Sequence, residues 1–144
     1  MNNNDKNMFE STEKLILKSN AMILFYMGIS FAEGGMTGEN DYQKAVDCYR
    51  QAAKLGNTDA MYCLAISYAK GLGVKLDHSI ACDWYAKAAS GGHSQSMYNL
   101  GLCFENGLGV DIDIDASFEY FKRAAELGNN DAIMRMEGRK VDIA

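Results

Sequence analysis

The chain has 144 residues, with 14 glycines, no proline and a formal net charge of −5. Its length fits one domain, and its 48% hydrophobic and 23% charged residues are typical of a globular protein rather than a disordered one. The negative charge argues against a nucleic-acid-binding domain, which needs a basic face to displace counterions.

The first twenty residues predict a capping helix. A mostly apolar stripe recurs there at helical spacing: Met8, Phe9, Thr12, Leu15 and Ile16. We expect this stripe to cover the outer side of the unit that follows it. Asn7 and Glu10 are the expected N-cap pair of this helix.

Residues 21–32 form an apolar run, AMILFYMGISFA. Such a run of twelve residues is too short to cross a bilayer, which takes about 20. A signal peptide has a short basic start, whereas the residues before this run include Asp5, Glu10 and Glu13. We therefore expect no membrane insertion, no signal peptide and a cytoplasmic location.

The rest of the chain repeats. Three segments align, starting at residues 44, 80 and 116: KAVDCYRQAAKLGNTDA, IACDWYAKAASGGHSQS and ASFEYFKRAAELGNNDA. Three others precede them, starting at residues 25, 62 and 98: FYMGISFAEGG, YCLAISYAKGLGV and YNLGLCFENGLGV. The constant spacing of 36 residues, with one extra residue in the first copy, predicts a solenoid of three repeats.

Each copy reads as two helices. In the second copy, one face of the first helix is marked by Ala60, Leu64, Ala65 and Tyr68. Gly71 is expected to end that helix, and Gly92 to end the next one. Asp77 is the expected N-cap of the second helix, as are Asp41 and Asp113 in the other copies.

A small residue lies in the middle of each first helix, at Gly28, Ala65 and Gly101. A glycine at such a position costs up to about 1 kcal/mol of helix propensity. We expect a facing aromatic side chain to pack against the helix backbone in compensation.

The second copy follows the pattern A-x3-L-G-x2-Y-x2-G-x-G-V-x2-D-x3-A-x2-W-Y-x2-A-A-x2-G, with Ala65 in place of the glycine after leucine. This pattern resembles the Sel-1-like repeat, a relative of the tetratricopeptide repeat. The third copy keeps most of it: Leu100, Gly101, Phe104, Gly107, Gly109, Val110, Asp113, Ala124, Ala125 and Gly128. The first copy departs most, because GGMTG replaces GxGV.

The resemblance implies an all-α, right-handed superhelical solenoid of about three helix-turn-helix repeats with a helical N-terminal cap. The expected divisions are a tail and capping helix at 1–20, repeats at 21–59, 60–95 and 96–131, and a truncated capping helix and tail at 132–144. Such proteins serve as adaptors in bacterial signalling, host interaction, envelope assembly and toxin neutralisation, and some are exported. The motif residues are structural, so the resemblance transfers no catalytic residue.

The four cysteines predict neither disulfides nor a metal site. Cys48, Cys63, Cys82 and Cys103 do not recur in register, as a disulfide-stapled array would require, so we expect free thiols. They also lack the spacing of metal ligands.

Other site motifs were considered and rejected. The two GLGV segments lie between predicted helices and match no phosphate-binding fingerprint. The acidic turn at residues 111–115 lacks the glycine and glutamate of a calcium loop. His78 and His93 lie at predicted helix boundaries, with no nucleophile at motif spacing. We therefore expect no catalytic residue, no cofactor and no metal.

By the resemblance, the first helices line the concave side of the solenoid. A stripe shifted by three residues from the core positions is left to face it: Tyr26, Ser30, Glu33, Cys63, Ser67, Lys70, Asn99, Cys103 and Asn106. These positions differ between copies, which suits a binding surface and equally an unconstrained surface. We take them as the candidate partner-binding residues, with Tyr26 as the aromatic anchor.

The first helix of the first repeat is apolar almost all round, over residues 22–29. Two explanations stay open: the N-terminal helix covers it, or it forms a homodimer or partner-helix interface. For the whole chain, we expect a non-catalytic scaffold for an unidentified protein partner, such as a regulatory or toxin-neutralising (immunity-type) protein. The alternative is a ligand-binding or hydrolytic domain that uses the groove as its site.

Overall fold

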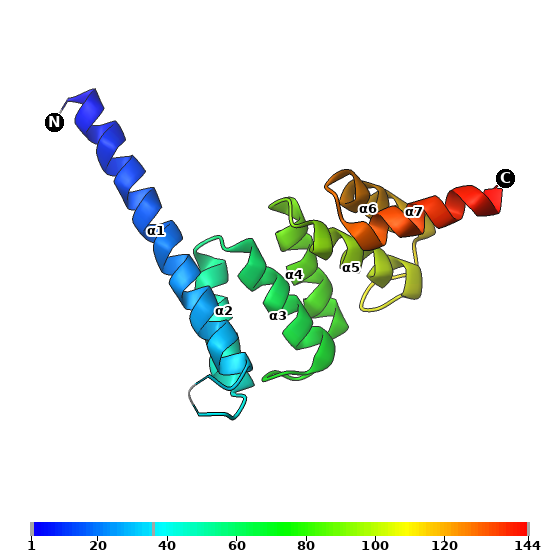
Figure 1. Cartoon of the computed structure of the whole chain (residues 1–144), viewed down its shortest axis with the longest axis horizontal. Coiled ribbons are helices and arrows are strands. Elements are labelled where there is room, and N and C mark those ends of the chain that lie inside the picture. The colour runs from blue at the N-terminus through cyan, green and yellow to red at the C-terminus, as the bar shows by residue number, and fades with distance from the viewer. Residues whose placement is uncertain (1, 36, 144) are drawn as a thin grey trace.

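The computed structural model describes the backbone of residues 2–35 and 37–143, with side chains up to residue 138. Within these residues the chain forms seven helices and no strand: α1 Asn3–Ala32, α2 Tyr42–Lys54, α3 Thr58–Lys70, α4 His78–Ser90, α5 Ser94–Asn106, α6 Ile114–Glu126 and α7 Asn130–Ile143. Neighbouring helices pack together, most extensively within the pairs α1–α2, α3–α4 and α5–α6. The pairs follow one another along the molecule (Figure 1). The expected all-α repeat solenoid is confirmed.

Aspartates begin the second helix of each repeat, as expected. The side chains of Asp41, Asp77 and Asp113 accept the backbone N–H three residues on, at 3.0, 3.0 and 2.9 Å. Each bond satisfies an N–H group that has no partner within the helix. The first helices of repeats two and three end at Gly71 and Gly107, whose φ angles of 70° and 68° are left-handed.

Glycines in the middle of two first helices let an aromatic ring lie against the helix backbone. A Cβ added to Gly28 would lie 2.5 Å from Cε1 of Tyr49, and one added to Gly101 would lie 2.6 Å from Cε1 of Phe121. Any side chain there would displace the ring, because real Cβ contacts are longer. The expected close approach is therefore confirmed.

The loops of the second and third repeats pack on the repeat before them. Gly73 and Gly109 have left-handed φ angles of 71° and 74°. A Cβ on either residue would lie 2.3 Å from the backbone of Tyr42 or His78, respectively. Tyr42 and His78 are the first residues of α2 and α4. The second glycine of GLGV thus permits contact between successive repeats.

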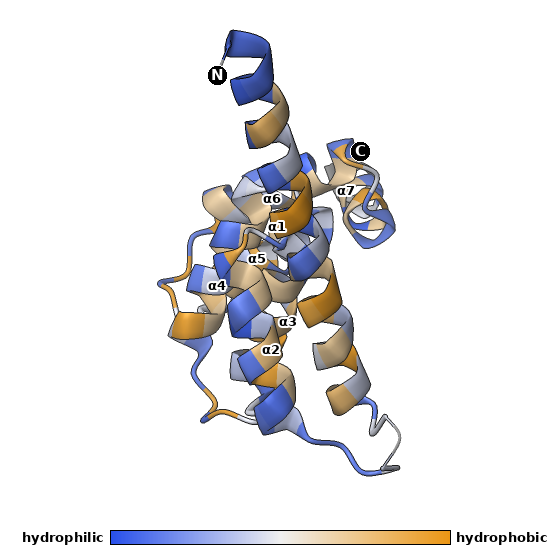
Figure 2. Ribbon diagram, turned by 90° about the vertical axis from the view of Figure 1, so that its left-hand side faces the viewer, coloured by the Kyte–Doolittle hydropathy of each residue, from blue (hydrophilic) through white to orange (hydrophobic). Residues whose placement is uncertain are grey.

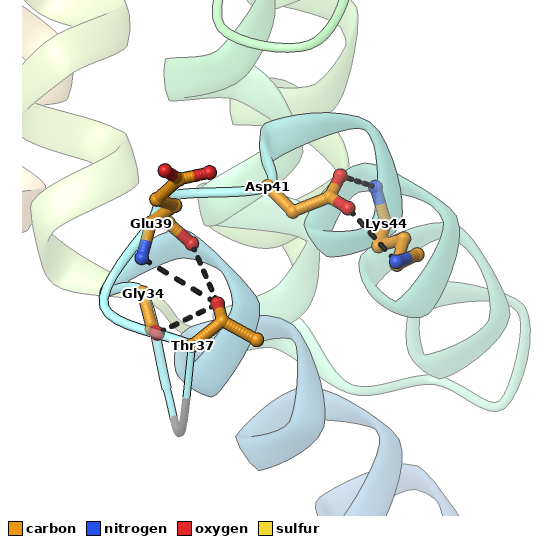
Figure 3. Close-up of polar contacts among 5 residues, drawn as sticks. All are labelled: Gly34, Thr37, Glu39, Asp41 and Lys44. Carbon is orange, nitrogen blue, oxygen red and sulfur yellow. Dashed lines mark hydrogen bonds and ion pairs between the residues drawn. The ribbon is translucent and has the colours of Figure 1, made fainter.

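Among the described residues the first repeat has no repeat before it, and its loop is closed by its own hydrogen bonds (Figure 3). The hydroxyl of Thr37 accepts the N–H of Glu39 at 3.4 Å and lies 3.2 Å from the carbonyl oxygen of Gly34. Asp41 then caps α2 and pairs with the ammonium of Lys44 at 3.1 Å. Since this loop meets no preceding helix, the GxGV pattern is not needed here.

The N-terminal region differs from the expectation. α1 is one continuous helix of 30 residues, capped by Asn2, whose side chain accepts the N–H of Asp5 at 2.9 Å. The expected cap at Asn7 and Glu10 is wrong, because both residues lie inside the helix. No Gly or Pro interrupts residues 3–27, so the helix continues through the boundary expected at residue 20.

The expected cover of the first repeat is also wrong. Residues 2–20 are all exposed, and this end of α1 projects beyond the other helices (Figures 1 and 2). The later part of α1 packs on α2 through residues that include Leu24, Phe25 and Phe31. Within the described part of the chain, no helix lies on the opposite face.

Two further differences concern length. α7 continues to Ile143, so residues expected as a polar tail are helical; Gly138 does not take the left-handed φ that ends a helix. α1 is long and apolar enough to cross a membrane by length and composition alone. The run of residues 21–32 gave a shorter estimate because it stopped at Ala21, whereas the helix extends upstream.

Candidate protein-binding surface

The nine candidate residues lie on or at the ends of α1, α3 and α5, the first helices of the repeats. Five are exposed: Tyr26, Ser30, Glu33, Lys70 and Asn106. Two are half-buried, Cys63 and Asn99, and two are buried, Ser67 and Cys103. The exposed members therefore gather on the first repeat and at the C-terminal ends of α3 and α5.

The half-buried candidates lie at the junctions between repeats. Tyr49 and Tyr85 occupy matching positions on α2 and α4. The hydroxyl of Tyr49 donates to the thiol of Cys63, and the amide of Asn99 donates to the hydroxyl oxygen of Tyr85. Each second helix thus reaches the next first helix at one register position, which in α1 is held by Tyr26.

The same register position continues in α7 at Arg135. Its guanidinium carbon lies 4.6 Å from the ring centroid of Phe121, the third repeat's counterpart of Tyr85. Arg135 also forms an ion pair with Glu105 on α5, which raises the pKa of the guanidinium. This contact was missed from the sequence, because Arg135 was assigned to a truncated cap; its spacing of 36 residues from Asn99 is the signal that could have found it.

A chain of polar side chains joins the last two junctions. Asn129 Nδ2 donates to Gln95 Oε1 at 2.9 Å, and Gln95 Nε2 donates to Asn99 Oδ1 at 3.2 Å. The amide of Asn99 then donates to the hydroxyl oxygens of Tyr62 and Tyr85. Because every member has a partner, the network fixes α5 between its neighbours.

The tyrosines and the Cys63 thiol at these junctions stay protonated at neutral pH. Burial raises the pKa of Tyr85 to about 12 and that of Cys63 to about 11. Burial also raises the pKa of Tyr49 and Tyr62. These residues therefore act as neutral hydrogen-bonding groups in the structure.

His93 is the N-cap of α5. Its Nδ1 accepts the N–H of Ser96 at 3.1 Å, and its Nε2 lies 3.3 Å from a carboxylate oxygen of Asp59 on α3. Nδ1 accepts only when it carries no proton, so the ring proton is assigned to Nε2. Asn57 and Asn129 cap α3 and α7 at the matching positions. The expected helix-boundary position of His93 is confirmed, and its role is structural.

Cys82 and Cys103 meet between α4 and α5 as free thiols. The Cys82 thiol donates to the carbonyl oxygen of Leu108 at 3.0 Å, and both side chains are buried. The interaction of the two thiols raises the pKa of Cys82 and lowers that of Cys103. Cys103 and Asn99 line a cavity of about 190 Å³ with Tyr85. This volume is below the roughly 300 Å³ at which small-molecule sites begin.

The described side chains are not grouped as the ligands of a metal ion would be. Within residues 2–35 and 37–138, no three His, Cys, Asp or Glu side chains are grouped to hold an ion. Asp113, in the acidic turn, is engaged as the cap of α6.

Comparison with known proteins identifies the repeats. The Sel1 repeat family profile matches residues 23–57, 58–93 and 94–129. The chain is similar to the crystal structure of a Sel1 repeat protein from Oxalobacter formigenes, at 29% identity and a TM-score of 0.72 over 81% of this chain and 46% of that one. It is also similar to a protective antigen with an SLR fold from uropathogenic Escherichia coli, at 34% identity and a TM-score of 0.75 over 88% of this chain and 26% of that one.

Cysteine rich protein B of Helicobacter pylori shares the fold, at 24% identity and a TM-score of 0.64 over 83% of this chain and 94% of that one. The chain spans less than half the length of the first two structures. No curated protein matches it. Sel1 repeats generally serve as scaffolds for protein–protein interaction. Three matched repeats over most of the sequence, on a solenoid of paired helices, show that this chain belongs to the Sel1 repeat family.

Proposed function

We propose that the chain is a non-catalytic scaffold that binds a protein partner through its first helices. The proposal rests on one position that matches between the repeats and lies at the end of each first helix. Glu33, Lys70 and Asn106 hold this position in the three repeats and are all exposed. The three matching positions thus carry an acid, a base and an amide. Such variation in side-chain chemistry between repeats gives a repeat surface its binding specificity.

The framework beneath Lys70 and Asn106 is buried in the same way in repeats two and three. Leu64 and Leu100 occupy matching positions in α3 and α5 and are both buried, as are Ala60 and Ser96. The separation of constant buried positions from variable exposed ones supports binding rather than catalysis. The groups that hydrolysis would need, His93 and the buried thiols, are engaged in caps and packing. A ligand-binding or hydrolytic domain is therefore the second candidate.

A cytoplasmic location without membrane insertion is part of the proposal. The inner face of α1 packs on α2, and a membrane-spanning α1 would have to give up these contacts. All four cysteines are free thiols, which suits a reducing compartment.

The test begins with capture of the partner on the immobilised full chain, followed by calorimetric titration of the purified partner. Lys70→Ala and Asn106→Ala remove exposed side chains, and we expect each to weaken binding at least about 5-fold. Asp83→Ala, exposed on the second helix α4, is the matched control and should leave affinity unchanged. Equal affinity for all three variants would refute binding through the first helices.

Within this function, we assign the chain a toxin-neutralising or regulatory role. A toxin-neutralising role predicts that the captured partner stops growth when expressed alone and that co-expression of this chain restores growth. The variant Lys70→Ala/Asn106→Ala should lose this rescue in proportion to its loss of affinity. If expression of the partner alone does not affect growth, the toxin-neutralising role is refuted and the regulatory role remains.

A further inference from the structure

An apolar stripe runs along the free face of α1. We call it the outer stripe, and it comprises Met8, Phe9, Leu15, Ile16, Met22, Ile23, Tyr26 and Met27, each between 45% and 69% exposed. Met8, Leu15 and Met22 recur every seven residues, and so do Phe9, Ile16 and Ile23. A seven-residue apolar repeat is the pattern by which one helix packs along another.

Comparison of matching positions in the repeats shows that the outer stripe has no covering helix among the described residues. Ile23 and Met27 are 58% and 45% exposed, whereas Ala60 and Leu64, their counterparts 37 residues later, are both 0% exposed. Ala60 and Leu64 are covered because they share a core cluster with α2, the second helix of the preceding repeat. Among the described residues no repeat lies before α1, so the face that α2 covers on α3 is open on α1.

The N-terminal part of α1 is little covered by the other described residues, although Lys14, Leu17 and Lys18 border residues 55–59. Residues 3–20 are helical and exposed throughout. An isolated helix of fewer than about 12–15 residues is marginal in water, and a somewhat longer one remains so unless its apolar face is buried. A helix that docks along α1 would cover the exposed stripe and would also stabilise residues 3–20.

We propose that this helix is α1 of a second copy, packed antiparallel. Eight large side chains, each about half exposed, present roughly 800 Å² if a full side chain of this size contributes about 200 Å². A standard-size interface takes about 800 Å² from each partner, so the stripe reaches this size when all eight side chains are fully buried in the pair.

The sequence of the stripe suits pairing with itself. In an antiparallel pair centred between residues 17 and 18, large side chains meet at both ends, and large side chains face small ones nearer the centre. The facing pairs are Met8–Met27, Phe9–Tyr26, Thr12–Ile23 and Ile16–Ser19, and Leu15 and Met22 lie level with Asn20 and Glu13. A two-fold axis makes every such contact twice, as in most homodimers.

A membrane surface fits less well. Residues 3–20 carry three lysines and three acids, so the polar side of α1 has no basic excess. Helices that lie on membranes combine an apolar face with a Lys- and Arg-rich one. Membrane binding is therefore an outcome that the experiment must detect.

Sedimentation velocity on the full chain tests the dimer. The wild type is expected to sediment as two chains, and Ile16→Glu is expected to raise the dissociation constant at least about 30-fold. Leu17→Glu is the control, because Leu17 is exposed and outside the stripe, although it borders Leu55 at the α2–α3 turn. Since Ile16 lies outside the repeats, thermal unfolding of Ile16→Glu should match the wild type.

Orientation is tested with engineered cysteines. A chain with Met8→Cys mixed with a chain with Met27→Cys should form a disulfide-linked heterodimer on oxidation, whereas Met8→Cys alone should not link efficiently. Efficient linkage of Met8→Cys to itself would overturn the antiparallel arrangement.

Two results would overturn the dimer. One is a monomeric wild type at concentrations on the order of 100 µM. The other is flotation of the wild type with vesicles of neutral or anionic phospholipid that Ile16→Glu abolishes, which would assign the stripe to a membrane. Because neither variant touches Lys70 or Asn106, failure of the dimer leaves the proposed partner surface untested by this experiment and open to its own titration.

Discussion

The N-cap position of the first helices carries side chains that join repeats as well as begin helices. His93 accepts the N–H of Ser96 and meets Asp59 of the preceding repeat, and Asn129 caps α7 while donating to Gln95. An N-cap is worth about 1 kcal/mol, and a second contact across the junction adds to it. Single polar residues thus couple local helix starts to the stacking of the solenoid.

We expect His93→Ala to lower the free energy of unfolding by about 1 kcal/mol or more, because α5 loses its cap. His93→Asn should keep most of the stability, since asparagine fills the matching positions 57 and 129. Chemical denaturation of both variants measures the difference. If the two variants were equally destabilised, the cap would not be the important interaction of His93.

The half-buried thiol of Cys63 provides a pH-dependent test. Its pKa is raised to about 11, chiefly by burial, so little thiolate exists at neutral pH. Alkylation of Cys63 by iodoacetamide should rise about tenfold per pH unit from pH 7 to 10, as long as the protein stays folded. An unperturbed thiol, with a pKa of about 8.5, levels off within that range. Peptide-resolved mass spectrometry on the native protein reads the rate, and a plateau below pH 9 would contradict the burial of this thiol.

Among the helices and loops, the features set by local backbone chemistry could be predicted from the sequence. Asp77 and Asp113 cap helices and Gly71 ends one because each acts within a few residues of itself. The division of α1 at residue 20 could not be predicted in this way. The helix continues past residue 20 because no helix-breaking Gly or Pro occurs there. The exposed residues 3–20 also make no packing contacts whose pattern would indicate a helix boundary.

Two loop glycines, Gly109 between α5 and α6 and Gly128 between α6 and α7, yield a matched pair of substitutions. Gly109→Ala places a Cβ 2.3 Å from the backbone of His78 and also strains a φ of 74°. Gly128→Ala strains a similar φ of 84°, but its Cβ meets nothing within 4 Å. We expect the second variant to cost about 1 kcal/mol, and the first to cost at least 2 kcal/mol more because two repeats must separate. Equal losses in denaturant unfolding would mean that this loop contact does not hold the repeats together.

At the scale of the whole molecule, each helix face is defined by the repeat that lies next to it. Helical spacing within one repeat predicted which side chains leave the core of that repeat. It could not show that Cys103 is buried against Cys82, or that Cys63 and Asn99 receive tyrosines from the preceding repeat, because those contacts arise only on stacking. Tyr26 of the first repeat is exposed, because no helix of the described residues packs on that face of α1.

Under these proposals the solenoid has two binding surfaces: the variable ends of the first helices, for a protein partner, and the free face of α1, for a second copy. The buried framework beneath Lys70 and Asn106 is the same in repeats two and three. Since each repeat contacts only its neighbours, changes to either surface should leave the fold intact.

The most direct measurement of the central claim is hydrogen–deuterium exchange of the chain with and without its purified partner. Slower exchange on binding is expected at the C-terminal ends of α3 and α5, where Lys70 and Asn106 lie, with α4 and α6 unchanged. Protection confined to the second helices α4 and α6 would contradict the account, because the partner would then bind the opposite helices of the solenoid.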